Sequence, residues 1–290
     1  MQRIRTDDFS MKHTVESAQP LTFFGDISAD GRHLRYVAGN SLVEVRQNDG
    51  LLYFGSQPTL SGTRLRKEIA KRFGLQDDMG RIYEKIGTDE FLANAIARYP
   101  GMRVTRNDPW ETTVCFIVSQ FNNVKRIRLI VRKLIENYGE LHSVDVGGKW
   151  VSFRSFPTPD ALAGIGVKEM MKKCGTGFRA KYIIGSARTC SESLDLNRLH
   201  HKDYHRAKEQ IMELPGVGDK VADCIMLMGY GKLEAFPIDT WIKRIVERVY
   251  FDGKKQGIKK IHEFADERWG DYAGYAQQYL FWAGRSLKIN

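Results

Sequence analysis

One short segment, residues 214–224 with the sequence LPGVGDKVADC, constrains the fold of this chain more than any other. Its proline and glycines predict a tight turn between two helices. Apolar residues recur at helical spacing on both sides of that turn, at Ala207, Ile211 and Leu214 and again at Val221, Ile225 and Met228. Residues 204–230 are therefore predicted to form a helical hairpin. Because the second helix begins with free N–H groups, the turn at Gly216, Val217 and Gly218 is a predicted phosphate-binding site.

Lys220 falls in the first turn of the second predicted helix, and Asp239 follows nineteen residues later in FPIDTW. An ordinary lysine is a free amine in only about one molecule in a thousand at neutral pH. An apolar pocket near a helix N-terminus favours the amine, so Lys220 is a candidate nucleophile and Asp239 its partner. A plainer interpretation stays open, in which Lys220 contacts a phosphate and Asp239 caps a helix.

Two helical faces indicate a pocket for a flat ligand. Lys220, Cys224 and Met228 are spaced by four residues and would share one face. Gln277 and Phe281, again four apart, offer an amide and an aromatic ring, which suit the edge and the face of a planar group. Cysteine, methionine and phenylalanine also fill ordinary cores, and that alternative stays open for each of them.

The charge of the chain agrees with an anionic partner. Lys and Arg exceed Asp and Glu by 45 − 35 = 10, and the pI is near 9.4, as expected for a protein that binds nucleic acid. The cysteines, Cys115, Cys174, Cys190 and Cys224, have no CxxC spacing and predict reduced thiols, not disulfides or a zinc site. No apolar run has the length of a signal peptide or a membrane span, so we expect a cytoplasmic protein.

The chain divides into a β-rich part and a helical part. Three β-rich pieces, residues 33–37, 41–46 and 51–54, are separated by turn dipeptides and predict an antiparallel sheet. Helical spacing begins near Gly62 and predominates beyond Pro109, although residues 112–118 (TTVCFIV) have strand propensity. We expect an α+β protein, with an N-terminal antiparallel β domain and flanking helices over residues 1–106 and a mostly helical body over residues 107–290.

The hairpin, its lysine and the later aspartate together resemble the helix-hairpin-helix DNA glycosylases, and the surrounding sequence is most similar to the 8-oxoguanine DNA glycosylase branch. The resemblance implies a two-lobed HhH-GPD body that grips double-stranded DNA, with residues 112–118 as a buried helix. It also implies that Lys220 displaces 8-oxoguanine from C1′ of its deoxyribose and leaves a Schiff base, through which β-elimination cleaves the strand. Asp239 would support the positive charge on the sugar.

The resemblance also assigns a damaged-base pocket. Cys224 and Phe281 stand where the family sandwiches the extruded base, and Gln277 stands where it reads the Watson–Crick edge. Met228 would lie on the same wall as Cys224. A main-chain carbonyl that accepts the N7–H of 8-oxoguanine would belong to Ala18. Guanine lacks that hydrogen, and its own N7 acceptor would be repelled.

Opposite the lesion, the family uses an asparagine, two arginines and a tyrosine wedge. An ungapped match keeps the arginines as Arg126 and Arg179 but puts Phe121 at the asparagine and Phe178 at the wedge. Asn122 would fill the asparagine role if the register shifts by one. Loss of the amide predicts a looser preference for cytosine opposite the lesion.

The resemblance implies no iron–sulfur cluster, because the clustered C-terminal cysteines of the endonuclease III branch are missing, and no other cofactor. A structural monovalent cation would bind the carbonyls of Met212, Leu214 and Val217, and Trp241 replaces a phosphate-binding histidine. We expect a monomer that acts on double-stranded DNA. Two alternatives stay open: a glycosylase for another damaged base, and a non-catalytic module that binds DNA or abasic sites.

Overall fold

Alternating apolar residues in the first sixty positions build a five-stranded antiparallel sheet. In the computed structural model, which describes residues 1–286, the strands are β1 (Gln2–Arg5), β2 (Asp26–Ile27), β3 (His33–Ala38), β4 (Ser41–Asn48) and β5 (Leu51–Gln57), in the order β1-β5-β4-β3-β2. Leu34, Val45 and Phe54 are paired across three strands and are fully buried on one face. The predicted antiparallel sheet is confirmed, although the sequence did not predict β1 or β2.

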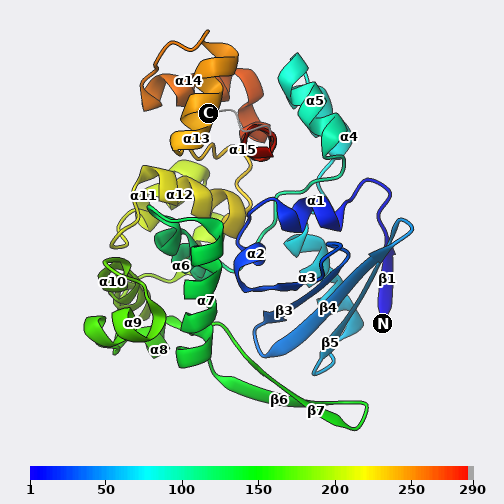
Figure 1. The fold of residues 1–290 in the computed structure, drawn as a ribbon, viewed down its shortest axis with the longest axis vertical. Helices are drawn as coiled ribbons and strands as arrows, with labels where there is room; N and C mark the ends of the chain where they lie inside the picture. The colour runs from blue at the N-terminus through cyan, green and yellow to red at the C-terminus, as the bar shows by residue number, and fades with distance from the viewer. Residues whose placement is uncertain (287–290) are drawn as a thin grey trace.

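The remaining elements are mostly helices, which lie beside and above the sheet in Figure 1. Three of them accompany the sheet: α1 (Met11–Glu16), α2 (Leu21–Phe24) and α3 (Gly62–Arg72). The others are α4 (Met79–Ile86), α5 (Glu90–Arg98), α6 (Pro109–Ser119), α7 (Val124–Tyr138), α8 (Pro159–Ala163), α9 (Val167–Cys174), α10 (Arg179–Glu192), η1 (Leu196–His201), α11 (Tyr204–Ile211), α12 (Asp219–Ile225), η2 (Met226–Tyr230), α13 (Thr240–Tyr250), α14 (Ile258–Trp269), η3 (Gly270–Tyr272) and α15 (Ala273–Ser286).

The protein has two hydrophobic cores, and residues from the first hundred positions contribute to both of them. The smaller core joins the sheet to α1 and α3 and ends at Phe73. The larger core includes Ile82 of α4 and Leu92 of α5 together with Tyr279 of α15. Figure 1 shows α4 and α5 beside α15, at the far end of the molecule from the sheet. Two helices that precede residue 107 therefore contribute to the core of the helical body.

Helix α6 runs through the centre of the larger core, and it contains the segment TTVCFIV. Asp108 caps the helix by accepting hydrogen bonds from the backbone N–H groups of Trp110, at 2.8 Å, and Glu111, at 3.1 Å. Pro109 starts the first turn, as its fixed φ favours. Residues 109–118 are all buried, so tertiary packing overrides the local strand propensity. The expectation of a buried helix is confirmed.

One element of the helical part was not predicted. Strands β6 (Leu141–Val146) and β7 (Lys149–Arg154) form a two-stranded hairpin that projects from the body (Figure 1). Its turn uses Gly147 and Gly148, both with positive φ, at +63° and +83°. Most side chains of this hairpin are exposed. The alternation of apolar and polar residues that indicates a strand in a sequence is therefore weak here.

Candidate active site

The predicted helical hairpin is present, with α11 and α12 joined by a tight turn over residues 212–218. Gly216 has a φ of +82°, and a Cβ atom there would lie 2.6 Å from Cγ of Tyr182. Helix α10 and the residue that follows α6 hold the turn: the Ser186 hydroxyl donates to the Pro215 carbonyl, and the Gln120 amide donates to the Gly216 carbonyl, each at 2.9 Å. The turn is thus fixed before any ligand arrives.

The outer side of the turn is open. A Cβ atom on Gly218 would meet nothing within 4 Å. Gly218 is also the N-cap residue of α12 and has no side chain to occupy the first N–H groups of that helix. Free N–H groups at the positive end of a helix dipole favour an anion, so the phosphate site at this turn stays a prediction that the open space at Gly218 permits.

Lys220 lies in the first turn of α12, as the sequence predicted. Its ammonium nitrogen stands 5.3 Å from the ring centroid of Phe116, a buried residue of α6. Sequence reasoning missed Phe116, because no periodicity links it to Lys220. Burial raises the pKa of the Cys224 thiol, one turn further along α12, to about 11. Cys224 is therefore a neutral, polarizable wall beside the amine at neutral pH.

Asp239 is the N-cap of α13. Its carboxylate oxygen Oδ1 accepts a hydrogen bond from the backbone N–H of Ile242 at 2.8 Å. After burial, the negative charge of Asp239 is one of the influences that raise the pKa of the Cys224 thiol. The plainer interpretation of Asp239 as a helix cap is therefore present in the structure. A cap uses only one carboxylate oxygen, so it leaves the charge of Asp239 available for the site.

Gln277 shows the feature expected of a residue that reads a ligand. Its side chain is 7% exposed, and its carbonyl oxygen Oε1 is buried with no hydrogen-bond partner. An unsatisfied buried acceptor costs about 1–3 kcal/mol, so native proteins rarely keep one without a use. Phe281, one turn further along α15, is half-buried, and Met228 is buried in the π-helical segment η2. The π-turn changes the spacing after α12, so Met228 no longer follows from a count of four residues.

Ala18 has an unusual backbone. Its φ is +59°, a left-handed conformation that costs a residue with a Cβ about 1–2 kcal/mol. The carbonyl of the preceding residue, Ser17, accepts a hydrogen bond from the amide of Gln278 at 2.9 Å. The structure thus brings the segment around Ala18, early in the chain, against α15 beside Gln277.

Two phenylalanines predicted to enter the DNA stand together on the surface. Phe121 is 94% exposed with a φ of +48°, and Phe178 is 46% exposed. Their ring centroids are 6.5 Å apart. Tyr182, which the sequence did not suggest, packs edge-on against Phe178 at 6.1 Å and also lies under Gly216. An aromatic cluster therefore adjoins the hairpin turn.

The polar residues predicted to face the opposite strand differ in their availability. Arg126 is exposed at the start of α7. Arg179 is buried, and its guanidinium donates to the backbone carbonyls of Gln120 and Phe121. Asn122 donates to the Val118 carbonyl at 3.1 Å, which closes the C-terminal end of α6. In this structure Arg179 and Asn122 shape the loop that carries Phe121, and Arg126 alone of the three extends into solvent.

Two family models together match residues 2–271 of this chain. The family model described as HhH-GPD superfamily base excision DNA repair protein matches residues 114–271. The family model described as 8-oxoguanine DNA glycosylase, N-terminal domain, matches residues 2–113. The chain belongs to the HhH-GPD superfamily. The family that the hairpin motif indicated is confirmed.

Individual relatives cover nearly the whole chain. A probable N-glycosylase/DNA lyase of Methanothermobacter thermautotrophicus is 30% identical over 96% of this chain and 94% of its own. A structure of MBOgg1 with a low-affinity DNA ligand has a TM-score of 0.88 at 35% identity, covering 99% of this chain and 96% of that one. A Clostridium acetobutylicum 8-oxoguanine glycosylase/lyase, bound to double-stranded DNA with cytosine opposite 8-oxoG, has a TM-score of 0.86 at 28% identity, covering 98% and 94%.

Within the part of this HhH-GPD chain that the structure describes, one group of possible metal ligands comes together. Atoms of Asp219, Asp223 and His262 lie within 4.8 Å of one another. The ammonium of Lys208 is already 2.7 Å from a carboxylate oxygen of each aspartate. Tyr204 donates to Asp223 at 2.5 Å. Because Lys208 supplies the positive charge, this group is best described as an ion-pair cluster, with Asp223 buried and Asp219 exposed, that joins α11, α12 and α14.

The proposed cation site and the phosphate contacts are less defined. The Leu214 carbonyl accepts a hydrogen bond from the Val217 N–H at 3.0 Å, which forms the turn. Met212 is exposed beside it, and Trp241 is half-buried in the first turn of α13. The roles of these residues stay predictions. Among the described helices, none combines the length and apolar character that a membrane span needs.

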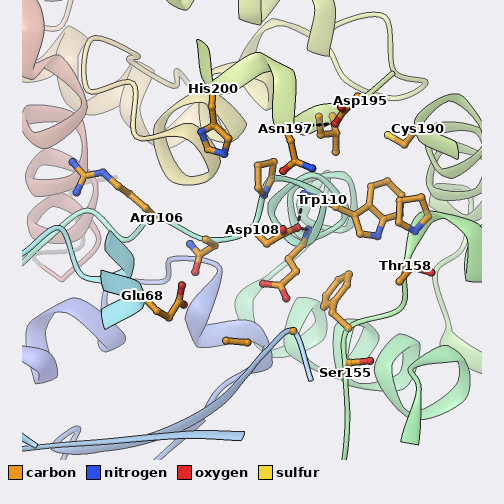
Figure 2. Close-up of a pocket in the computed structure, with 18 of the residues that line it drawn as sticks. Glu68, Arg106, Asp108, Trp110, Ser155, Thr158, Cys190, Asp195, Asn197 and His200 are labelled. Carbon is orange, nitrogen blue, oxygen red and sulfur yellow. Dashed lines mark hydrogen bonds between the residues drawn. The ribbon is translucent and has the colours of Figure 1, made fainter. Parts of the chain in front are cut away.

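A cavity of about 990 Å³ lies apart from these residues. It opens at the N-terminal end of α6, between α3 and η1, and Figure 2 shows Glu68, Arg106, Asp108 and His200 around it. Lys220, Asp239, Gln277 and Phe281 do not line it. This cavity is therefore distinct from the residues of the predicted base pocket.

Proposed function

We propose that this HhH-GPD protein removes 8-oxoguanine from duplex DNA and cleaves the strand at the resulting abasic site. The match to the N-terminal domain of 8-oxoguanine glycosylases and the relatives described as N-glycosylase/DNA lyase support this substrate class. One observation carries the proposal: Gln277 keeps a covered, unpartnered acceptor in a protein whose hairpin also presents Lys220. The Watson–Crick edge of 8-oxoguanine offers N1–H and N2–H donors that satisfy such an acceptor.

The chemistry needs a nucleophile and a stabilised positive charge. In the proposed reaction, the Lys220 amine attacks C1′ while the C1′–N9 bond breaks, and the base leaves with the bonding electrons and takes up a proton. Opening of the sugar gives an imine between Lys220 and C1′. Loss of a proton from C2′ then breaks the C3′–O3′ bond, and water releases Lys220. Asp239 stabilises the positive charge that develops on the sugar. These steps use side chains of this chain and water.

The surrounding surface suits duplex DNA. The open turn at Gly218 faces a phosphate with its N–H groups, and a net charge of +10 favours association with the backbone. The exposed pair Phe121 and Phe178 fills the gap that an extruded base leaves in the helix. Arg126, exposed nearby, reads the acceptor edge of the orphan base.

Strand cleavage tests the proposal. Three labelled duplexes carry 8-oxoguanine, guanine or an abasic site opposite cytosine, and each is analysed with and without alkali. We expect cleavage without alkali at 8-oxoguanine and at the abasic site, and none at guanine. Cleavage at the abasic site alone would indicate a glycosylase for another base. Binding to all three without cleavage would indicate a non-catalytic module.

A further inference from the structure

A buried chain of hydrogen bonds starts next to Ala18. Gln19 is 1% exposed and uses both ends of its amide. Its nitrogen donates to the Arg103 carbonyl at 2.7 Å and to the Ser17 hydroxyl at 2.9 Å. Its oxygen accepts from the Thr105 N–H at 2.7 Å and from the Thr105 hydroxyl at 3.1 Å. The loop that carries Ala18 is thus tied to the segment before α6.

The hydrogen bonds continue to the segment that follows the helix carrying Lys220. The Thr105 hydroxyl accepts a hydrogen bond from the Asn107 amide at 3.1 Å. Asn107 then donates to the Met228 carbonyl from its backbone, at 2.7 Å, and from its side chain, at 3.3 Å. The Asn107 oxygen accepts from Arg72 at 3.1 Å. Gln19, Thr105 and Asn107 therefore connect the Ala18 loop to η2, which follows α12 directly.

This connection joins two walls of the predicted base pocket. The prediction assigns Ala18 to one wall and Cys224 and Met228 to the other. Gln278 adds a third tie through its bond to the Ser17 carbonyl, next to Gln277 on α15. Gln19, Thr105, Asn107 and Gln278 are each buried, so none of them is placed to touch DNA itself.

A single carbonyl that distinguishes N7–H from a bare N7 must be placed closely, because a hydrogen bond weakens steeply with distance and angle. Residues 17–19 lie outside any helix or strand, and Ala18 is held at a positive φ. Surrounding contacts must maintain such a conformation. We propose that Gln19, Thr105 and Asn107 are positioning residues that set the discrimination between 8-oxoguanine and guanine. This inference rests on the proposed function.

A substitution at Thr105 can remove one hydrogen-bonding group without changing the size of the side chain. Thr105→Val keeps the shape of the side chain and removes only the hydroxyl that links Gln19 to Asn107. Thr105→Ser keeps the hydroxyl and serves as the matched control. Gln278→Met removes the separate tie to Ser17 at nearly constant volume. All three are made in a Lys220→Gln background, so that binding of intact duplexes is measured without turnover.

The measurement is the dissociation constant for three duplexes, which carry 8-oxoguanine, guanine or a tetrahydrofuran abasic site opposite cytosine. We expect Thr105→Val and Gln278→Met each to reduce the preference for 8-oxoguanine over guanine by roughly tenfold. Abasic-site binding should stay unchanged, because no base enters the pocket. Thr105→Ser should restore the preference.

Two results would overturn the inference. In the first, the preference is intact in Thr105→Val and Gln278→Met. In the second, both variants lose affinity equally for all three duplexes, which is general loosening without a role in discrimination. If the Lys220→Gln protein itself shows no preference for 8-oxoguanine, the proposed function fails instead, so the two failures are distinguishable.

Discussion

Gly216 and Gly218 stand two residues apart in the hairpin turn, yet the structure gives them different roles. Gly216 has a φ of +82°, and an added Cβ would lie 2.6 Å from Cγ of Tyr182. Gly218 has a φ of −95°, and an added Cβ would meet nothing within 4 Å. Gly216→Ala therefore tests how the turn folds, whereas Gly218→Ala tests what approaches the turn from outside.

The magnitudes follow from these contacts. A left-handed φ costs a residue with a Cβ about 1–2 kcal/mol, and a methyl group forced against a packed ring costs about 1–3 kcal/mol, so Gly216→Ala should lower the free energy of unfolding by about 2–5 kcal/mol. With an unfolding entropy of roughly 0.6 kcal/mol per kelvin for a chain of this length, the Tm should fall by roughly 3–8 °C. Gly218→Ala changes only an N-cap residue and should cost under about 1 kcal/mol.

For DNA affinity we expect the opposite order, with the larger loss in Gly218→Ala. The methyl group of Gly218→Ala occupies the space through which a phosphate reaches the N-terminus of α12, so affinity for an abasic-site duplex should fall roughly tenfold. Thermal unfolding by circular dichroism and fluorescence anisotropy with labelled duplex measure the two quantities. A Gly216→Ala protein that melts like wild type would refute the steric argument. Wild-type DNA affinity in Gly218→Ala would refute the phosphate site.

Three further substitutions test single residues. Asp239→Asn keeps an N-cap acceptor for Ile242, so stability should change by under about 1 kcal/mol, while base excision falls roughly 10²–10⁴-fold; normal excision would mean that Asp239 is only a cap. Burial and the charge of Asp108 raise the pKa of Glu111 to about 8, so native Glu111 keeps a proton that the unfolded chain releases at lower pH, and stability falls as the pH rises toward 8. Between pH 6 and pH 9, the free energy of unfolding measured in urea should fall by about 3 kcal/mol less in Glu111→Gln than in the wild type. An equal fall in the two proteins would contradict this assignment. Wild type should excise 8-oxoguanine at similar rates opposite all four bases, and Phe121→Asn, at a φ of +48° that asparagine tolerates, should favour cytosine roughly tenfold; a strong cytosine preference in wild type would contradict the assignment.

The sequence predicted those parts of the fold that local patterns determine. The strands β3, β4 and β5 follow from alternation and turn glycines, and the hairpin of α11 and α12 follows from helical spacing around Pro215. Helix α6 shows the limit of local reasoning, because TTVCFIV favours a strand and becomes helical only within the core. Strand β1 pairs with β5, about fifty residues away, and no local signal indicates such a partner.

The sequence predicted which residues form the candidate site, but not which side chains they contact. The sequence placed Lys220 in the first turn of a helix, where the structure has it, but gave no hint of Phe116 beneath its amine. Arg179 was expected to face DNA, and its guanidinium is instead buried against carbonyls of the loop near residue 120. These contacts join residues about sixty positions apart, for Arg179, and about one hundred, for Lys220, and periodicity does not reveal such partners.

Borohydride trapping tests the central claim most directly. The wild type and Lys220→Gln are each incubated with a duplex that carries one 8-oxoguanine opposite cytosine, and sodium borohydride reduces any imine to a stable protein–DNA adduct. We predict an adduct with the wild type and none with Lys220→Gln. Base release by the wild type without an adduct would contradict the account, because water and not Lys220 would then be the nucleophile.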